Sequence, residues 1–418
     1  MDTQRVSGTD VVVAAQTLGQ TVRTTPCEPS ARLSNMCGYP VYLKREDIQV
    51  GRSYKVRGAY NVISGLSAQD VRHGVVCASA GNHAQGVAFA CHKKQIPGTI
   101  FIPSTTPRQK RSRIADIGGE WVTLQIMGST FDESSQAAIS YAKEVGATYI
   151  HPFDDPRTIA GQGTVVKEIF SQVPQQPASV LVPVGGGGLL AGTLAWIKQF
   201  HPDVTVIGVE PAGAASMRAA LDAGAPQTLS DIDTFADGTA VARVGDLTFT
   251  LVQELCDHVI TVPEGAICSE MLDLYHVEGI ITEPAGALAS AALRGYVNDY
   301  LPEGPVACIV SGGNNDVLRY DDIVERSMIH EGLRHYFLVT FPQKPGALRG
   351  FLDDVLSDGE DIIQFEYTKK NNRDMGPALV GIEIDDPAGI DALLERMHAS
   401  ELDIEKLEPN SPAFRFVL

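Results

Sequence analysis

The sequence predicts an α/β protein with open, mostly parallel sheets, followed by a smaller C-terminal unit. Three observations lead to this fold class. Short runs of apolar residues alternate with helical patterns over the first three hundred residues, the runs are mostly apolar along their length, and the pattern changes near Ile329. Buried strands joined through helices are typical of parallel sheets.

The apolar runs of the first part are short enough to be buried strands. We expect strands at Val75–Ala78, Gly98–Ile102, Trp121–Leu124, Ser179–Val184, Thr205–Val209, His258–Val262 and Val306–Val310. The segments between them predict helices that include Ala84–Lys93, Phe131–Val145, Leu189–Phe200 and Ser269–Leu274. This alternation favours parallel strands that are connected by helices.

The remaining residues predict a unit of a different kind. Its elements in order are strand, helix, strand, turn, strand, helix and strand, at Tyr336–Phe341, Gly346–Leu356, Asp361–Thr368, Asn371–Gly376, Ala378–Ile384, Ala388–His398 and Leu402–Leu407. The order βαββαβ is that of a ferredoxin-like unit. We therefore expect two domains, 1–328 and 329–418.

Composition narrows the function classes. The 418 residues include 33 Lys and Arg against 51 Asp and Glu, a net charge of −18, so a nucleic-acid partner is not expected. The seven cysteines form no C-x-x-C pair, which indicates a reducing compartment and no metal framework. Prolines and glycines interrupt the longest uncharged stretch, so we expect no membrane segment and a cytoplasmic location.

Four consecutive glycines, Gly185, Gly186, Gly187 and Gly188, follow a predicted strand, and a helix begins near Leu189. Backbone N–H groups in such a turn can converge on an anion, and the helix dipole favours negative charge there. Four glycines also cost backbone entropy without a packing benefit. A phosphate site is therefore favoured over a plain turn.

The same glycines leave a second interpretation open. Gly186-x-Gly188-x-x-Ala191 matches a dinucleotide fingerprint, and Glu210 ends the next strand at nearly the spacing of a ribose-binding acid. From this segment alone, a nicotinamide enzyme stays possible.

A second glycine-containing loop, Ser79-Ala80-Gly81-Asn82-His83, lies between a predicted strand and a helix. It offers a hydroxyl, an amide and exposed N–H groups at a helix N-terminus, which suit a carboxylate. The structural alternative is that Ser79 caps the helix and His83 lies on the surface.

Two further segments complete the set. Arg45–Ala59 contains Lys55 and is mostly typical of a solvated charge run, while Ser311 ends a predicted strand and precedes Gly312, Gly313 and Asn314. Ligands of open α/β sheets bind outside the carboxyl ends of strands. The four segments therefore indicate one cleft.

Taken together, the motifs S-Y-K-V-R-G-A, S-A-G-N-H-A-Q-G, G-G-G-G-L and S-G-G-N appear in the order of a known family. They resemble fold-type II pyridoxal phosphate enzymes of the tryptophan synthase β-like family, specifically the biosynthetic threonine dehydratases (threonine ammonia-lyases). The resemblance extends from about Thr24 to the C-terminus.

The resemblance implies pyridoxal 5′-phosphate as cofactor and a role for each motif. Lys55 would carry the cofactor covalently, Asn82 would bind its 3′-oxygen, Ser311 would face its pyridine nitrogen, and Gly185 to Leu189 would bind its phosphate. Ser79, Ala80, Gly81, Asn82 and His83 would bind the substrate carboxylate. A small subdomain, about 59–161, would close on substrate, with Glu283 and Asp237-Gly238-Thr239 in the same wall.

The implied reaction is deamination of L-threonine to 2-oxobutanoate and ammonia through loss of the β-hydroxyl as water, the first step of isoleucine synthesis. The C-terminal unit resembles an ACT-like regulatory domain, through which isoleucine inhibits the enzyme and valine often opposes that inhibition. Family members are usually homotetramers, and a homodimer is the alternative. Other possibilities are serine dehydratase or racemase, threonine synthase, or a catalytically silent amino-acid sensor.

Two positions depart from the family pattern. Tyr54 stands before the lysine, where phenylalanine is usual, and Glu210, Ala214 and Ser216 resemble a cation-binding stretch whose third position lacks the usual acid. For Glu210 we expect a structural helix entry rather than a metal site.

Overall fold

The computed structural model describes residues 5–367, 369, 374–409, 411 and 414. The chain divides into two compact units, Met1–Asp316 and Val317–Leu418. Helix α13 (Tyr320–His330), which contains the expected boundary after residue 328, belongs to the second unit. The boundary between domains 1–328 and 329–418 stays a prediction.

The large sheet of the first unit has six strands in the order β1-β2-β10-β7-β8-β9. Neighbouring strands are parallel except β1 and β2 at one edge, which are antiparallel. The bounds in this order are Cys27–Ser30, Val41–Arg45, Val306–Val310, Ser179–Pro183, Thr205–Pro211 and His258–Val262. All five residues of β7 and of β10 are buried, as expected for the centre of a parallel sheet.

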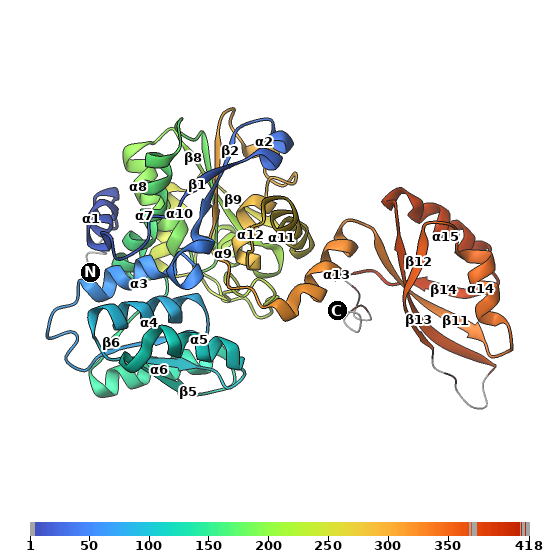
Figure 1. Cartoon of the computed structure of the whole chain (residues 1–418), viewed down its shortest axis with the longest axis horizontal. Helices are drawn as coiled ribbons and strands as arrows, with labels where there is room; N and C mark the ends of the chain where they lie inside the picture. Colours follow the sequence, from blue (N-terminus) through green and yellow to red (C-terminus); the bar gives the residue numbers. More distant parts are fainter. Residues whose placement is uncertain (1–4, 368, 370–373, 410, 412–413, 415–418) are drawn as a thin grey trace. The chain divides into compact units, whose positions relative to one another are not determined.

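Helices surround this sheet and connect its strands (Figure 1). Their bounds are α1 Gly8–Leu18, α2 Ala31–Cys37, α3 Lys55–Ser64, α7 Pro156–Gln172, α8 Gly188–Phe200, α9 Ser216–Ala223, α10 Asp246–Leu255, α11 Glu264–Glu278 and α12 Pro284–Ala291. Helices α7 and α8 pack closely, because Gly163 and Gly192 bring their backbones together.

A smaller parallel sheet of four strands has the order β5-β4-β3-β6. Its strands are β3 Val75–Ala78, β4 Gly98–Ile102, β5 Val122–Ile126 and β6 Thr148–Tyr149, and its helices are α4 Asn82–Lys94, α5 Arg108–Gly118 and α6 Phe131–Val145. Helix α6 begins with a capping box, in which Thr130 accepts the Glu133 N–H and Glu133 accepts the Thr130 N–H.

In the second unit, four antiparallel strands have the order β12-β13-β11-β14. Their bounds are β11 Arg334–Pro342, β12 Glu360–Tyr367, β13 Met375–Ile384 and β14 Asp403–Lys406, with helices α14 Ala347–Val355 and α15 Ile390–Ala399. Phe337, Phe351, Val380 and Leu393 share its core. Thr368, which ends the expected strand Asp361–Thr368, lies outside the described residues, and so do residues 371–373 of the expected turn.

The predicted fold class is confirmed by the two parallel sheets and the βαββαβ order of the second unit. The strands β3, β4, β9 and β10 have the predicted bounds, whereas β1, β2 and β6 were missed. No helix among the described residues is long and apolar enough to span a bilayer.

Candidate active site

Lys55 is the first residue of α3, and the two residues before it pair with the chain just after β10. The Tyr54 N–H donates to the Ser311 carbonyl at 3.2 Å, and Ser53 forms an isolated bridge with Gly312. The Lys55 Nζ donates to the Pro152 carbonyl at 3.3 Å and lies 5.3 Å from the centre of the Tyr54 ring. The Tyr54 ring therefore packs beside the lysine, as phenylalanine could.

Burial lowers the pKa of the Lys55 amine to about 8, although the nearby Glu283 carboxylate opposes this shift. An ordinary lysine has a pKa above 10, so its neutral fraction at neutral pH is far smaller. Lys55 therefore has the property that a nucleophilic or basic amine requires.

The glycine loop connects β7 to α8. Gly187 has φ +92° and caps α8, whose first residue is Gly188. The first N–H groups of a helix have no partner within the helix, so this end presents donors together with the positive end of the dipole. The loop thus offers backbone N–H groups with no side chain of its own to fill the space before them.

The glycines also have a packing function, which the sequence argument denied. A Cβ on Gly186 would lie 2.4 Å from the Phe153 ring, and one on Gly185 would lie 2.9 Å from the Thr239 backbone. A Cβ on Gly187 would lie 2.7 Å from Met217. The expectation that four glycines bring no packing benefit is therefore wrong: close packing and anion binding require the same residues.

Ser311 follows β10 directly and is buried. Its hydroxyl donates to the Ala285 carbonyl at 2.9 Å. A hydroxyl can rotate and has acceptor capacity besides its one donor, so Ser311 can also contact a ring nitrogen. Its place at the carboxyl end of a central strand agrees with the predicted cleft.

Asn82 begins α4 and makes hydrogen bonds with both ends of its amide. Its Nδ2 donates to Glu283 Oε1 at 2.6 Å, and its Oδ1 accepts from Asn314 Nδ2 at 2.7 Å. Asn314 also donates to the Gly51 carbonyl at 2.7 Å. Asn314 has no role in the predicted site, although its position three residues after Ser311 was the available signal.

The loop before α4 differs from both sequence interpretations in detail. The Ser79 hydroxyl accepts from the Gly81 N–H at 3.1 Å, and Gly81 rather than Ser79 occupies the N-cap position. His83 is buried, with Nε2 3.0 Å from the Ile150 carbonyl, so the alternative of a surface histidine is wrong. Burial, with the Lys55 charge nearby, lowers the pKa of His83 to about 3, so the ring is neutral.

Glu210 has a structural function. Its two carboxylate oxygens accept the backbone N–H groups of Met217 and Arg218, each at 2.7 Å, at the start of α9. Burial raises its pKa to about 8, against the effect of these two hydrogen bonds. Among the described residues, no group of three or more His, Cys, Asp or Glu side chains is placed to hold a metal ion.

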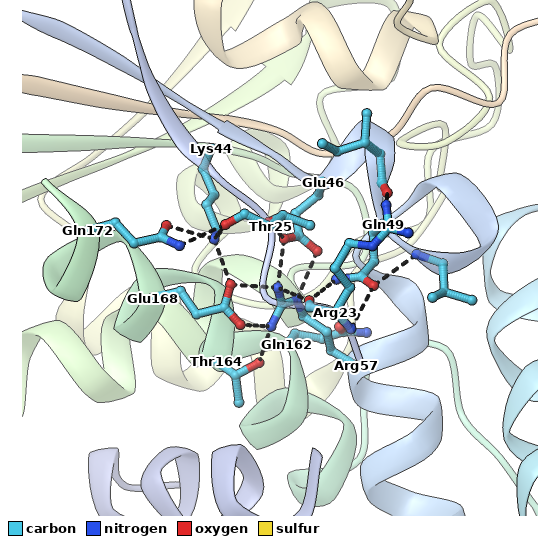
Figure 2. Close-up of polar contacts among 12 residues, drawn as sticks. Arg23, Thr25, Lys44, Glu46, Gln49, Arg57, Gln162, Thr164, Glu168 and Gln172 are labelled. Carbon is cyan, nitrogen blue, oxygen red and sulfur yellow. Dashed lines mark hydrogen bonds and ion pairs between the residues drawn. The ribbon is translucent and has the colours of Figure 1, made fainter. Parts of the chain in front are cut away.

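The charge run around Lys55 is largely buried, so the interpretation of Arg45–Ala59 as mostly solvated is wrong. Figure 2 shows its centre, where Arg57 of α3 lies between Glu46 and Glu168 of α7. Arg57 donates to both Glu46 oxygens at 2.8 and 2.7 Å and to both Glu168 oxygens at 2.7 and 2.9 Å. Lys44 of β2 contacts Glu168 at 2.6 Å.

This ion-pair cluster, formed by Lys44, Glu46, Arg57 and Glu168, holds the start of α3. Its two positive and two negative charges balance, and the side chains of Lys44, Glu46 and Arg57 are at most 1% exposed. Gly58 and Gly161 bring α3 and α7 close enough that a Cβ on either would clash. Lys55 therefore belongs to the part of the first unit that is built around the large sheet.

The described residues fit pyridoxal phosphate. A glycine loop at a helix N-terminus suits the phosphate, a partly buried lysine of lowered pKa suits the aldehyde, and an amide and a hydroxyl suit the polar atoms of the ring. The same fit is weaker for a dinucleotide, because Glu210 uses both oxygens in the start of α9.

Comparisons with known proteins agree with this geometry. Residues 18–312 match the family described as pyridoxal-phosphate dependent enzyme, and residues 325–417 match the C-terminal regulatory domain of threonine dehydratase. The cofactor is therefore pyridoxal phosphate, and the nicotinamide alternative is wrong.

Individual relatives cover nearly the whole chain. The L-threonine dehydratase biosynthetic IlvA of Mycobacterium tuberculosis is 52% identical over 415 residues, which are 99% of this chain and 96% of the relative. That of Corynebacterium glutamicum is 50% identical over 417 residues, 99% of this chain and 95% of the relative.

Solved structures match about three quarters of the chain. Threonine deaminase isoform 2 of Solanum lycopersicum aligns with a TM-score of 0.72 and 39% identity over 77% of this chain and 87% of its own. Serine racemase of Dictyostelium discoideum aligns with a TM-score of 0.69 and 32% identity over 75% of this chain and 99% of its own. The chain therefore belongs to the pyridoxal-phosphate dependent enzymes, within them to the biosynthetic L-threonine dehydratases.

Proposed function

We propose that this chain is a lyase that deaminates L-threonine to 2-oxobutanoate and ammonia, as the first step of isoleucine synthesis. The observation that carries the proposal is the partly buried Lys55 amine, which has a pKa of about 8, lies next to the Tyr54 ring and follows residues that pair with the end of β10. The family of the chain and the names of its relatives support the reaction and the substrate.

Bound pyridoxal phosphate supplies an electron sink that stabilises negative charge at the substrate Cα. The N–H groups of Gly185 to Leu189 bind its phosphate, Asn82 donates to the ring oxygen, and Ser311 contacts the ring nitrogen. Lys55 is the covalent anchor. A hydroxyl such as that of Ser311 holds no fixed negative charge, so it does not keep a proton on the nitrogen.

Lys55 also removes the proton from Cα of the substrate. Its lowered pKa provides a neutral amine near physiological pH, and its place on a helix fixed by the ion-pair cluster keeps Nζ in position. The β-hydroxyl leaves with a proton as water, which gives 2-aminocrotonate. Its imine tautomer then takes up one water and releases 2-oxobutanoate and ammonia. The loop from Ser79 to His83 binds the substrate carboxylate through backbone N–H groups and the Ser79 hydroxyl.

The purified protein tests this proposal directly. We expect visible absorption from bound cofactor, attachment of the cofactor to Lys55 after borohydride reduction and mass spectrometry, and release of 2-oxobutanoate from threonine. The variant Lys55→Ala should lose all three, while Lys143→Ala, an exposed lysine of α6, should retain them. A protein that binds cofactor at Lys55 yet releases no keto acid contradicts the proposed reaction.

Serine is the second candidate substrate, because 75% of the chain aligns with a serine racemase at 32% identity. Steady-state rates with both amino acids, together with a chiral assay of the remaining serine, separate the dehydratase from the racemase. Threonine synthase requires a phosphorylated substrate, and turnover of unphosphorylated threonine to 2-oxobutanoate excludes it. A silent sensor would bind an amino acid without turnover.

The second unit is a regulatory domain by family and implies an amino-acid effector. We propose isoleucine as the inhibitor and valine as its antagonist. Gly346, with φ +90°, precedes α14, whose start has no side-chain cap, and N–H groups in the first turn of a helix suit a carboxylate. Initial rates at several isoleucine concentrations, with and without valine, test both effectors. Unchanged rates contradict this regulation.

We also propose a homotetramer or homodimer in the cytoplasm. Symmetric self-association is common among soluble enzymes, and all seven cysteines are free thiols, which suits a reducing compartment. Sedimentation equilibrium of the holoenzyme measures the oligomeric state. Cell fractionation shows the compartment in which the protein is located. A monomer at all concentrations contradicts the assembly.

A further inference from the structure

Glu283 is a buried carboxyl group that the mechanism above does not use. It lies directly before α12, at the N-cap position, yet its side chain makes no capping hydrogen bond. Glu210, in contrast, uses both oxygens on the backbone at the start of α9. The side chain of Glu283 therefore serves something other than the start of its own helix.

That partner is the Asn82 amide, 201 positions away in the sequence, whose Nδ2 donates to Glu283 Oε1 at 2.6 Å. On the other side of the amide, the Asn82 Oδ1 accepts from Asn314. Among the contacts of the described residues, Asn82 thus retains one N–H of Nδ2 for a ligand. On the Nδ2 side of the amide, the group that Asn82 presents to a ligand is therefore a hydrogen-bond donor.

Two glycines, Gly238 and Gly312, leave space for the Glu283 side chain. A Cβ on Gly312 would lie 2.1 Å from Glu283 Oε1, and one on Gly238 would lie 3.4 Å from the same atom. The Glu283 N–H donates to the Gly312 carbonyl at 3.2 Å. The first glycine of S-G-G-N therefore provides the space in which this carboxyl group reaches Asn82.

Four charged or titratable groups face Glu283. Asp237 and Lys110 form an ion pair at 2.8 Å beside it, and Lys55 and Tyr54 lie within its electrostatic reach. Burial raises the pKa of Glu283 to about 7, Asp237 adds to this, and the Asn82 hydrogen bond opposes it. In either protonation state, one oxygen can accept from Asn82.

We propose that Glu283 is a positioning residue that holds the Asn82 amide with an N–H directed at the ring oxygen of the cofactor. The proposal rests on the proposed role of Asn82. An asparagine amide can otherwise turn by 180° and present its carbonyl oxygen, which would repel the ring oxygen. Glu283 accepts on one side and Asn314 donates on the other, so the two residues together exclude the turned amide.

The test is a double-mutant cycle with the dissociation constant of pyridoxal phosphate as readout, measured by titrating cofactor-depleted protein. We expect Glu283→Ala to weaken cofactor binding by about tenfold, as loss of a charge-assisted hydrogen bond does. Glu283→Gln keeps an acceptor oxygen and should lie within about threefold of the wild type. In the Asn82→Ala background, Glu283→Ala should have no further effect.

Controls separate this role from a general structural role. Glu270→Ala removes another buried carboxyl group, which pairs with Arg32 at 2.8 Å, and should lower the unfolding temperature while cofactor affinity stays unchanged. If Glu283→Ala does not fold, Glu283→Leu keeps most of the volume without an acceptor and is used in its place. Folding of each variant is checked by circular dichroism.

Two results would overturn the proposal: wild-type cofactor affinity in folded Glu283→Ala or Glu283→Leu, or additive effects of the Glu283 and Asn82 substitutions. A failure of the proposed cofactor site looks different. In that case Asn82→Ala itself binds pyridoxal phosphate as the wild type does.

Discussion

The Arg57 guanidinium makes a two-pronged contact with the Glu46 carboxylate, with Nε–Oε2 and Nη2–Oε1 distances of 2.8 and 2.7 Å. Both side chains are at most 1% exposed. Arg57 lies two residues after Lys55 and points away from the cleft into the ion-pair cluster. The lysine that we propose as the cofactor anchor is thus placed by a buried ion pair that Arg57 of its own helix makes.

Replacing Arg57 with methionine should destabilise the first unit strongly. The substitution leaves the buried Glu46 carboxylate without its ion-pair partner, while Glu168, which is 19% exposed, keeps Lys44. Breaking a buried pair from one side costs about 3–5 kcal/mol, because the other charge stays uncompensated. Urea unfolding of the holoenzyme measures this loss.

Arg243→Met is the matched control for this prediction. Arg243 pairs with Asp246 at 2.7 Å on the surface of the same unit, and both side chains are exposed. Exposed pairs contribute about 0–1 kcal/mol, so the variant should unfold almost as the wild type does. Equal losses in the two variants contradict a special role of the buried cluster.

The cluster also predicts acid sensitivity. Although burial raises the pKa of Glu46, the Arg57 charge and hydrogen bonds outweigh it, so the pKa lies below its usual 4.5. The folded state therefore binds fewer protons than the unfolded state. Its extra stability is present above pH 4.5 and is lost as the pH falls through the lowered pKa. Glu46→Gln should have a flatter stability profile in this acid range, measured by urea unfolding.

Cofactor attachment should depend on the ionisation of Lys55. Its pKa of about 8 means that the neutral amine becomes the major form above that pH. For cofactor-depleted protein, the rate of covalent attachment should rise with pH and level off above about pH 8, followed by stopped-flow absorbance. A rate that continues to rise towards the pKa of an ordinary lysine, above 10, contradicts the lowered value.

Gly186→Ala should disturb the glycine loop. The new methyl group would lie 2.4 Å from the Phe153 ring, and overpacking of this kind costs about 1–3 kcal/mol. Cofactor affinity should fall as well, because the loop has to move. Gly389→Ala, where nothing lies within 4 Å of the added Cβ, should leave both properties unchanged. Thermal unfolding and cofactor titration measure them.

Features that depend on local pattern were predictable from the sequence. Strands β3, β4, β9 and β10 are short apolar runs buried in parallel sheets, so their bounds follow from composition alone. The glycine loop was recognisable in the same way, whereas Lys55 stood in an apparent charge run and gained its role only through the family resemblance.

Features that depend on distant partners were not predictable. Glu46 and Arg57 resemble surface charges until Glu168 and Lys44, from another helix and another strand, come to balance them. The packing function of Gly186 depends on Phe153, which lies 33 positions earlier in the sequence. Asn314 and Glu283 gain their meaning only through Asn82.

The split of the site between two sheets has a mechanical consequence. Lys55, the glycine loop and Ser311 belong to the side of the large sheet, whereas Asn82 and the loop before it belong to the helix that follows β3 of the small sheet. A cofactor held by both groups joins the two sheets. Pyridoxal phosphate is then a structural tie as well as a reagent, and its removal should loosen the small sheet against the large one.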